Sequence, residues 1–294
     1  MGRGAGAFVA TWLSGCGPAP ADHPASPPST PPHATGAGDA TPTVETKQRA
    51  VTVQTPDGTA DAFFVSPTTG RHPGVIVWPD IAGLREAFET MAARLAARGY
   101  AVLVVNQYYR SAKAPVLRTF SEWQTDEGRA KIDPMRAPLT AAAIASDGAA
   151  FVAWLDQQAE VDPDRKLATS GYCMGGPFTF RTAAAAPERV GAIASFHGGG
   201  LATEADDSPH LLLPRMRAAA LVCVAQSDDE RNPAVKSTLR EAFAAAGLTA
   251  ELEVYPARHG WCVTDSPVYD GAQADRAWSR MLATFEAHLS SPTG

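Results

Sequence analysis

The chain has 294 residues, 45% of them hydrophobic, and its 25 basic and 31 acidic residues give a formal net charge of −6. This length and composition suffice for one large α/β domain or two smaller ones, and the lack of a basic block argues against a nucleic-acid partner. No stretch approaches the roughly twenty apolar residues that a membrane-spanning helix needs. The four cysteines show no C-x-x-C pair and no zinc-ligand spacing, so we expect no disulfide framework.

The N-terminal residues 1–16 resemble a bacterial lipoprotein signal. Arg3 precedes a short apolar run, which closes on Leu-Ser-Gly-Cys16, a lipobox-like sequence in which the cysteine is lipidated. A mis-assigned start or a plain disordered leader are the alternatives. Residues 17–46 are rich in Pro, Ala, Ser and Thr, which predicts a flexible linker. Lipidation at Cys16 would anchor the protein in the cell envelope; we expect an envelope or secreted protein, with a cytoplasmic one as the alternative.

Residues 47–290 alternate strand and helix patterns. Two strand patterns, 49–54 and 60–65, flank Pro56-Asp57-Gly58, which predicts a β-hairpin. Short continuous apolar runs then predict strands buried on both faces of a sheet, and apolar residues at helical spacing predict helices between them. The expected strands are 74–78, 101–105, 166–170, 192–196, 219–225 and 251–255, and the expected helices are 87–98, 139–158, 178–186, 233–246 and 274–289. This order predicts a single α/β domain with a mostly parallel, doubly wound sheet and catalytic groups at the strand carboxyl ends.

Residues 106–138 have weak periodicity. A long irregular stretch inside an α/β domain is more often a functional loop or a cap than filler, so we expect this segment to serve the site. Its candidate residues are Tyr108, Tyr109, Arg110, Phe120 and Trp123.

The sequence Gly-Tyr-Cys-Met-Gly-Gly, residues 171–176, lies at a strand-to-helix turn. Glycines flanking one reactive residue are typical of a nucleophile elbow, which turns sharply and presents that side chain to a cleft. The reactive residue is Cys173. The adjacent helix N-terminus favours the thiolate, the form that attacks carbonyl groups. On this motif alone, a buried cysteine beside a glycine-rich turn is the alternative.

An elbow of this kind predicts an acid and then a histidine after later strands. The strand 219–225 runs into Asp228 and Asp229, and the strand 251–255 is followed by His259. We expect His259 to act as general base and then general acid, and Asp228 to orient its ring, with Asp229 as a close competitor. Together with Cys173 these residues form a candidate Cys-His-Asp triad.

These motifs resemble the dienelactone hydrolase family of α/β-hydrolases, whose nucleophile is cysteine, over residues 48–289. The resemblance implies an α/β-hydrolase fold and a carboxylic ester hydrolase of the carboxymethylenebutenolidase type. It implies that Asp80 activates the thiol, where the best-known members carry glutamate, and that Arg110, with Tyr108 near it, binds a substrate carboxylate. The second arginine of the family pattern, four residues past the histidine, is replaced here by Val263.

The backbone amides of Met174 and Ile81 are the expected oxyanion hole, since they follow the nucleophile and the first parallel strand. Cys223 is interpreted as a buried hydrophobic residue. Cys262 either lines the pocket or packs under its loop, and His197 either caps a loop, forms a pocket wall or takes part in the chemistry. No residues have the spacing of a metal site or a nucleotide-binding loop, so we expect neither metal nor cofactor.

We therefore expect a hydrolase that cleaves a small-molecule ester or lactone through a covalent acyl-enzyme on Cys173. A broad carboxylesterase or thioesterase with the same triad is the nearest alternative, and an idle envelope lipoprotein that binds a small ligand is another. A monomer is favoured, although the sequence does not determine the oligomeric state.

Overall fold

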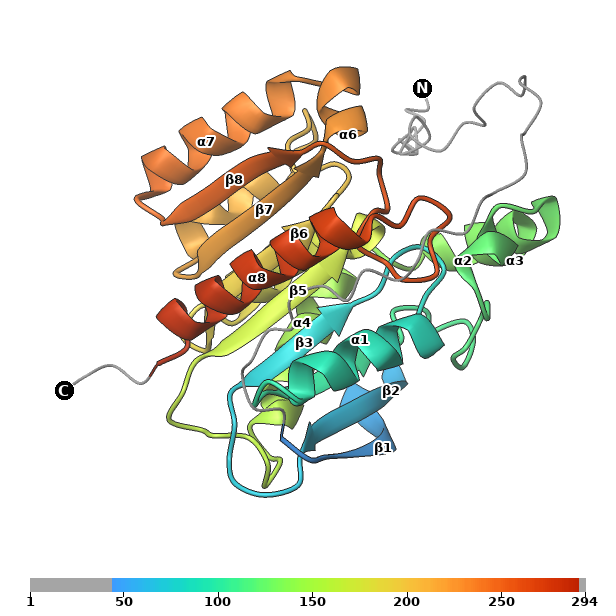
Figure 1. Cartoon of the computed structure of the whole chain (residues 1–294), viewed down its shortest axis with the longest axis vertical. Helices are drawn as coiled ribbons and strands as arrows, with labels where there is room; N and C mark the ends of the chain where they lie inside the picture. Colours follow the sequence, from blue (N-terminus) through green and yellow to red (C-terminus); the bar gives the residue numbers. More distant parts are fainter. Residues whose placement is uncertain (1–43, 291–294) are drawn as a thin grey trace, which may run out of the picture. The chain divides into compact units, whose positions relative to one another are not determined.

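The computed structural model describes residues 44–290, which form one α/β domain built on an eight-stranded sheet (Figure 1). The strand order is β1-β2-β4-β3-β5-β6-β7-β8. The strands are β1 Thr46–Thr55, β2 Gly58–Pro67, β3 Gly74–Trp78, β4 Ala101–Val105, β5 Leu167–Tyr172, β6 Val190–Phe196, β7 Ala219–Ala225 and β8 Ala250–Tyr255. The expected lipoprotein signal, residues 1–16, and nearly all of the expected linker, residues 17–46, lie outside the described residues.

The N-terminal hairpin and the parallel sheet are confirmed. β1 pairs antiparallel with β2, and β2 pairs antiparallel with β4. From β4 onward all neighbouring strands are parallel. The carboxyl ends of β3, β5, β7 and β8 therefore lie along one edge of the sheet, which is where ligand and catalytic groups gather in folds of this kind.

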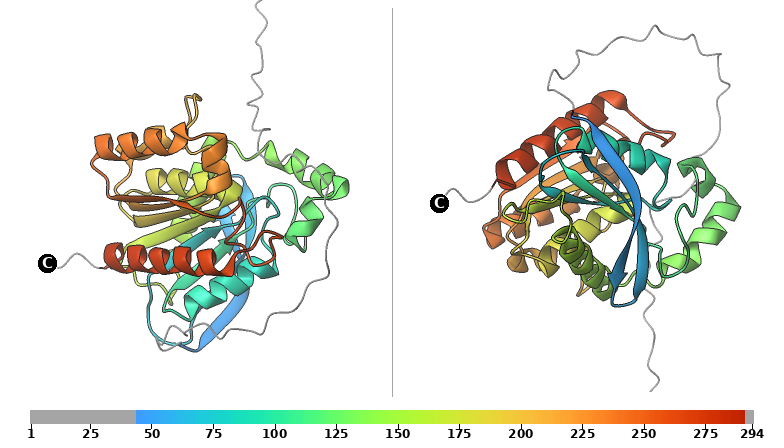
Figure 2. Two further views of the ribbon diagram at one scale, coloured as in Figure 1. Left: turned by 45° about the horizontal axis from the view of Figure 1, so that its top comes forward. Right: turned by 90° about the horizontal axis from the view of Figure 1, so that it is seen from below.

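Helices cover both faces of the sheet (Figures 1 and 2). They are α1 Glu86–Ala96, α2 Phe120–Trp123, α3 Asp126–Arg136, α4 Ala141–Leu155, α5 Gly176–Ala185, α6 Gln226–Arg231, α7 Ala234–Ala246 and α8 Gly271–His288, with 3-10 turns η1 Cys173–Gly175 and η2 Pro209–Arg215. Residues of α1 and α8 share one buried cluster, and residues of α4, α5 and α7 share another. The sheet is thus the middle layer of three.

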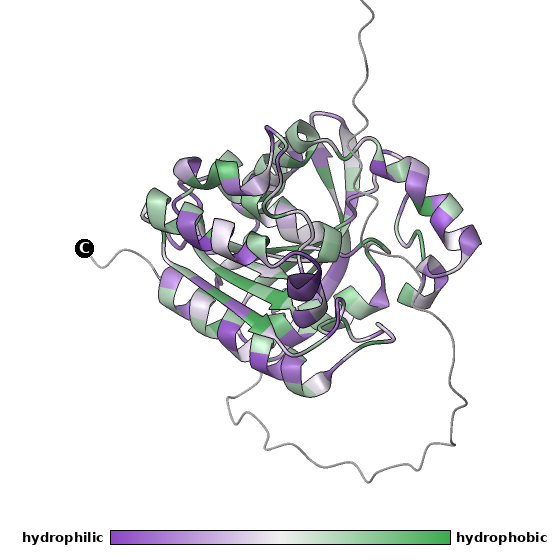
Figure 3. Cartoon of the chain, turned by 90° about the horizontal axis from the view of Figure 1, so that it is seen from above, coloured by the Kyte–Doolittle hydropathy of each residue, from purple (hydrophilic) through white to green (hydrophobic). Residues whose placement is uncertain are grey.

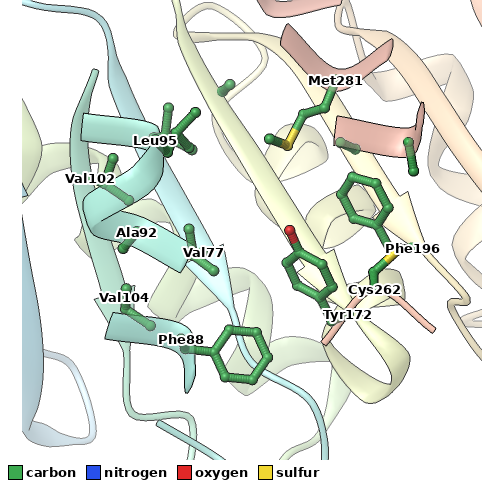
Figure 4. Packing of buried hydrophobic residues seen from close by; sticks show 14 of the residues in the cluster. Val77, Phe88, Ala92, Leu95, Val102, Val104, Tyr172, Phe196, Cys262 and Met281 are labelled. Carbon is green, nitrogen blue, oxygen red and sulfur yellow. The ribbon is translucent and has the colours of Figure 1, made fainter. Parts of the chain in front are cut away.

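The side chains of the inner strands alternate between these two clusters. Val75 and Val77 of β3 face the α1 and α8 side, while Ile76 and Trp78 face the α4 and α5 side. Figure 4 shows the first cluster, in which Phe88 of α1 lies over the sheet near Tyr172. Burying one such side chain contributes on the order of 1.5–3 kcal/mol to the stability of the fold. Because both faces of these strands are buried, their sequences are continuous apolar runs. In Figure 3 the central strands are accordingly green, whereas the surrounding helices mix purple and green.

The stretch 106–138 is more regular than its sequence predicts, because it contains the helices α2 and α3. Thr125 caps α3 by accepting a hydrogen bond from the backbone N–H of Gly128 at 3.0 Å. Only Gly128 and Ile132 of α3 are buried, so the helix has too few apolar positions to give a clear period. We call residues 106–138 the cap segment, since its apolar side chains form a third cluster together with Ile81 and Ala82.

Two smaller elements were also not expected. The acidic residues after β7 start the short helix α6 instead of a loop, and η2 precedes β7. Within the residues that the structure describes, no single helix is both long and apolar enough to cross a membrane, and only α3 with α4, bent by 84° at their junction, meet the criterion as a pair.

Candidate active site

The turn after β5 is so tight that it excludes side chains at two glycines. A Cβ atom on Gly171 would lie 2.1 Å from the carbonyl oxygen of Gly175, and a Cβ on Gly175 would lie 2.3 Å from that of Trp78. Between these glycines Cys173 has a φ of 52°, in the left-handed region that residues other than glycine rarely adopt. Such strain costs on the order of 1–3 kcal/mol and clusters at functional sites. The elbow geometry expected from the sequence is therefore present, with a partly exposed thiol at its apex.

His259 and Asp228 are hydrogen-bonded to each other. Their strands, β8 and β7, pair in register from Ala220 and Ala250 to their carboxyl ends, which brings the two following loops together. The Nδ1 atom of His259 lies 2.7 Å from Oδ2 of Asp228, and the His259 backbone N–H donates to Oγ of Ser227 at 3.0 Å.

Asp229, the competing carboxylate, does not reach the histidine. It pairs instead with Nζ of Lys236 at 2.6 Å. Successive residues of the short helix α6 point in different directions, so only one of the two aspartates can face the β8 loop. The structure places Asp228 in that position.

The pKa of His259 is raised well above its ordinary value. Burial of the ring favours the neutral form, but the charge and hydrogen-bonding capacity of Cys173 and Asp228 outweigh this effect. The Nε2 atom is buried and has no hydrogen-bond partner among the described residues. Cys173 is thus near enough to influence the protonation of His259, while Nε2 stays uncommitted and can exchange a proton.

Asp80, which the family resemblance assigns to thiol activation, has a different partner. Its two carboxylate oxygens accept hydrogen bonds from Arg85 at 2.7 and 2.9 Å, and Oδ1 also accepts from the Ala82 backbone N–H at 2.9 Å. Arg85, whose side chain is 0% exposed, continues to Asp265 at 2.7 Å. The carboxylate of Asp80 is thus paired with a buried guanidinium, and its expected role towards Cys173 stays a prediction.

Arg110, the expected anchor for a substrate carboxylate, is also occupied. Its guanidinium donates to Asp147 at 2.7 and 2.8 Å and to Asp57 at 2.6 Å. Two carboxylates already neutralise this cation, so a third anion gains little from it. The structure therefore does not support the expected role of Arg110.

Tyr108 is not available to a substrate either. The residue is 1% exposed, and its hydroxyl donates to the carbonyl oxygen of Ile81 at 2.7 Å. Burial raises the pKa of this phenol well above its ordinary value. Tyr108 therefore braces the loop after β3 from the cap segment, a structural contact in place of the expected substrate contact.

The two residues expected to supply the oxyanion hole lie in one neighbourhood. Ile81 belongs to the cap cluster, and Met174 packs against the same cluster. The Tyr108 hydroxyl, bonded to the Ile81 carbonyl, also lies 3.9 Å from Sδ of Met174. The loop after β3 and the turn after β5 are thus held side by side, as the hypothesis requires.

His197 contacts the backbone of the nucleophile. Its Nδ1 atom accepts a hydrogen bond from the Cys173 backbone N–H at 3.1 Å. Sequence reasoning left its role open, and it missed Arg85 and Asp265 altogether. The sequence does carry a signal for Arg85. It is a charged residue next to the predicted start of α1, and it lies five positions after the aspartate at a strand end.

The two remaining described cysteines are packing residues. Cys223 is fully buried in β7, and burial raises the pKa of its thiol. Cys262 packs near Phe196 and Tyr172 on the α1 and α8 side of the sheet (Figure 4), and burial raises its pKa as well. Across residues 44–290 no group of His, Cys, Asp or Glu side chains is arranged to hold a metal ion.

Comparison with known proteins identifies the family. Residues 60–289 match the model of the dienelactone hydrolase family. A "Putative carboxymethylenebutenolidase" from Yersinia pestis is 29% identical over 238 residues, which are 77% of this chain and 83% of that protein. A carboxymethylenebutenolidase from Rhodococcus opacus is 25% identical over 232 residues, which are 78% and 86% of the two chains.

A solved structure supports the fold. The "Putative Dienelactone Hydrolase" of Klebsiella pneumoniae superposes with a TM-score of 0.72 at 24% identity, and the match covers 83% of this chain and 100% of the other. The model match spans most of the chain, including the elbow, the acid and the histidine. The chain therefore belongs to the dienelactone hydrolase family and is a hydrolase of the ester and lactone type.

Proposed function

We propose that this hydrolase cleaves its ester or lactone through a thioester formed on Cys173. The observation that carries the proposal is the Asp228–His259 hydrogen bond of 2.7 Å beside a cysteine held in a strained elbow. The pKa of His259 is raised by Cys173 and Asp228 against the effect of burial, which supports a ring that takes up a proton during the reaction. This is the arrangement by which a cysteine is activated for nucleophilic attack.

The reaction then follows in two balanced steps. The Cys173 sulfur attacks the carbonyl carbon, and collapse of the tetrahedral intermediate breaks the bond to the alkoxide oxygen, which takes the proton from His259 Nε2. Water next attacks the thioester while His259 accepts one of its protons. Collapse of the second intermediate releases the carboxylic acid product and returns the proton to the Cys173 and His259 pair. Asp228 holds the ring and stabilises the imidazolium throughout.

The oxyanion of both intermediates is assigned to the backbone N–H groups of Met174 and Ile81. Their shared packing under the cap segment supports this assignment, because a hole must be formed before the charge develops. Removing one such donor in other hydrolases costs on the order of a hundredfold or more in rate.

The substrate is proposed to be an ester or lactone without an obligatory carboxylate. Arg110 is neutralised by Asp57 and Asp147, and the second family arginine is replaced by the buried Val263. The relatives named carboxymethylenebutenolidase suggest a lactone. The cap cluster adds apolar surface next to Ile81, which favours an uncharged acyl group.

The test is hydrolysis of an aryl acetate, an uncharged lactone and a dienelactone carboxylate by the full chain and its Cys173→Ala variant. We expect turnover of the uncharged substrates that disappears with the thiol, and a thioester that accumulates transiently under single-turnover conditions. Full activity in Cys173→Ala would exclude the nucleophile assignment. Binding without turnover by the wild type would favour the small-ligand-binding role, and turnover of the aryl acetate alone would make the protein a broad carboxylesterase.

A second proposal concerns location: the chain is lipidated at Cys16 and anchored in the cell envelope. The apolar run and the Leu-Ser-Gly-Cys16 sequence support it. Metabolic labelling with a fatty acid tests it, with Cys16→Ala as the matched variant. Label that is absent from the wild type, or that persists in Cys16→Ala, excludes lipidation at this residue.

A further inference from the structure

We propose that His197 is a positioning residue that fixes the backbone of the nucleophile from the end of β6. This inference rests on the proposed role of Cys173. It starts from the bond between two side-by-side strand ends, in which the Nδ1 atom of His197 accepts from the Cys173 backbone N–H at 3.1 Å. A side chain from the neighbouring strand thus holds the backbone N–H of Cys173.

The loop after β6 holds the other backbone group of the nucleophile as well. The Gly199 backbone N–H points to the Cys173 carbonyl oxygen at 3.4 Å. The two loops also touch closely, since a Cβ atom on Gly176 would lie 2.5 Å from the Cα of Gly198. The peptide groups on both sides of the Cys173 side chain are therefore held by one rigid loop, which explains how a φ of 52° persists at a residue other than glycine.

His197 is itself held firmly enough for this task. Its backbone N–H donates to the carbonyl oxygen of Cys223 at 2.8 Å, which ties it to β7. Its φ is 40°, a second left-handed residue, and its side chain is 1% exposed. The ring stands edge-on to Trp261, with the ring centroids 5.1 Å apart. A ring fixed on three sides can hold its partner in one geometry.

The hydrogen bond also determines the tautomer of His197. Because Nδ1 accepts a hydrogen bond from the Cys173 N–H, the ring proton of neutral His197 must lie on Nε2. Nε2 is buried and has no hydrogen-bond partner among the described residues. If Nδ1 were protonated, its N–H would face the N–H of Cys173, and two donors cannot bond to each other. The protonated ring would also place a positive charge near His259, since the two ring centroids are 4.9 Å apart. Burial and the neighbouring His259 both lower the pKa of His197, consistent with a neutral ring.

A neutral His197 suits the chemistry assigned to this site. The only imidazolium needed is that of His259, and a second one at this distance would oppose it. His197 thus combines two properties that no aliphatic residue has together: an acceptor for the Cys173 N–H and a shape that packs against Trp261. Misplacing reacting groups by about 1 Å can cost on the order of a hundredfold in rate, so the effect of losing the acceptor should be large.

The test compares His197→Phe, which keeps a ring without an acceptor, with His197→Asn, which keeps an acceptor and tolerates left-handed φ. His288→Phe is the matched control, because it makes the same change at an exposed histidine at the end of α8. The readouts are the rate of Cys173 alkylation by iodoacetamide, kcat and KM for the best substrate, and the unfolding temperature. Alkylation needs no substrate, and Cys173→Ala subtracts the labelling of other thiols.

We expect His197→Phe to lower kcat and the alkylation rate about ten- to a hundredfold with little change in KM. His197→Asn should recover most of both, despite its smaller side chain. Equal losses in the two variants, or a full alkylation rate in folded His197→Phe, would overturn the proposal. Should His197→Phe fail to fold, His197→Ala takes its place. Wild-type alkylation at Cys173 that is fast without any turnover would instead count against the proposed function and leave this inference standing.

Discussion

The buried charges around Arg85 make the sharpest stability prediction. Replacing Arg85 by Met keeps an unbranched side chain but removes the hydrogen bonds to Asp80, to Asp265 and to the Gly83 carbonyl oxygen. The carboxylate of Asp80, a residue that is 1% exposed, would then keep its hydrogen bond from the Ala82 N–H but lose both bonds from the guanidinium. Breaking a buried ion pair from one side typically costs about 3–5 kcal/mol, because the remaining charge is left without compensation.

The loss should appear as a lower unfolding temperature. For a domain of this size 1 kcal/mol corresponds to about 2–4 °C, so Arg85→Met should lower the unfolding temperature by about 10 °C or more. Arg217→Met is the matched control: its ion pair with Glu188 is 68% and 66% exposed, and such pairs contribute at most about 1 kcal/mol. Adding Asp80→Asn to Arg85→Met should restore part of the stability, since no charge then remains buried alone.

Calorimetry gives the unfolding temperature, and iodoacetamide labelling at a temperature where all variants are folded gives the reactivity of Cys173. We expect Asp80→Asn to label at nearly the wild-type rate, because Asp80 is bound to Arg85. Two results would refute this reasoning. One is an Arg85→Met protein as stable as the wild type. The other is a stable Asp80→Asn protein with an unreactive thiol, which would return Asp80 to the role of thiol activator.

Three further predictions concern charged side chains. Asp228→Asn should lower kcat on the order of a hundred- to ten-thousandfold, because the ring of the histidine loses its orientation and its countercharge, whereas Asp229→Asn should change kcat little. Arg110→Met should leave the ratio of kcat/KM for carboxylated and uncharged lactones unchanged, as measured by steady-state kinetics. Arg49→Met should destabilise the protein at neutral pH and progressively less in acid, as measured by urea unfolding. The reason is that the Arg49 hydrogen bond lowers the pKa of Glu160 from 4.5 to about 2, so the stabilisation is present above about pH 4.5 and is lost as the pH falls towards 2.

Each of these predictions has a contrary outcome. If Asp229→Asn proved as damaging as Asp228→Asn, the assignment from the 2.7 Å hydrogen bond would be wrong. A selective loss of the carboxylated lactone in Arg110→Met would restore the substrate anchor. A pH-independent effect of Arg49→Met would mean that its contact over the Phe64 ring, with 4.5 Å between the Arg49 Cζ and the ring centroid, accounts for the whole effect.

Much of the fold could be predicted because its signals are local. Strands such as β3 and β7 bury both faces and therefore read as short apolar runs, and the Pro-Asp-Gly turn marks the hairpin. The elbow could be predicted because its backbone requires glycine at two positions: a Cβ at Gly171 or Gly175 would clash with a carbonyl oxygen. Helix α3 was missed because it buries only two of its residues.

The partners of the charged side chains could not be predicted in the same way. Asp80 and Arg110 occupy the positions that the family resemblance assigns, yet Asp80 is paired with Arg85 of its own loop and Arg110 with Asp147 of α4. Which cation meets which carboxylate depends on side-chain directions across the sheet edge, and a spacing along the chain does not contain that information. The choice between Asp228 and Asp229 was open for the same reason. The role of His197 could not be inferred from the sequence, because it depends on the hydrogen bond between its Nδ1 atom and the Cys173 backbone N–H.

The attachment of the cap segment has a consequence for how this family can diversify. The segment leaves the sheet after β4 and returns at α4, so it is an insertion between two framework elements. It is joined to the site through the Tyr108 bond to the Ile81 carbonyl and through the Phe120 backbone N–H, which donates to Asp265 at 2.9 Å. The proposed catalytic residues Cys173, Asp228 and His259 follow other strands, β5, β7 and β8. Exchange of this one insertion could therefore alter which molecules are accepted while leaving the reactive centre untouched, so that selection on substrate range and selection on chemical competence act on separate parts of the chain.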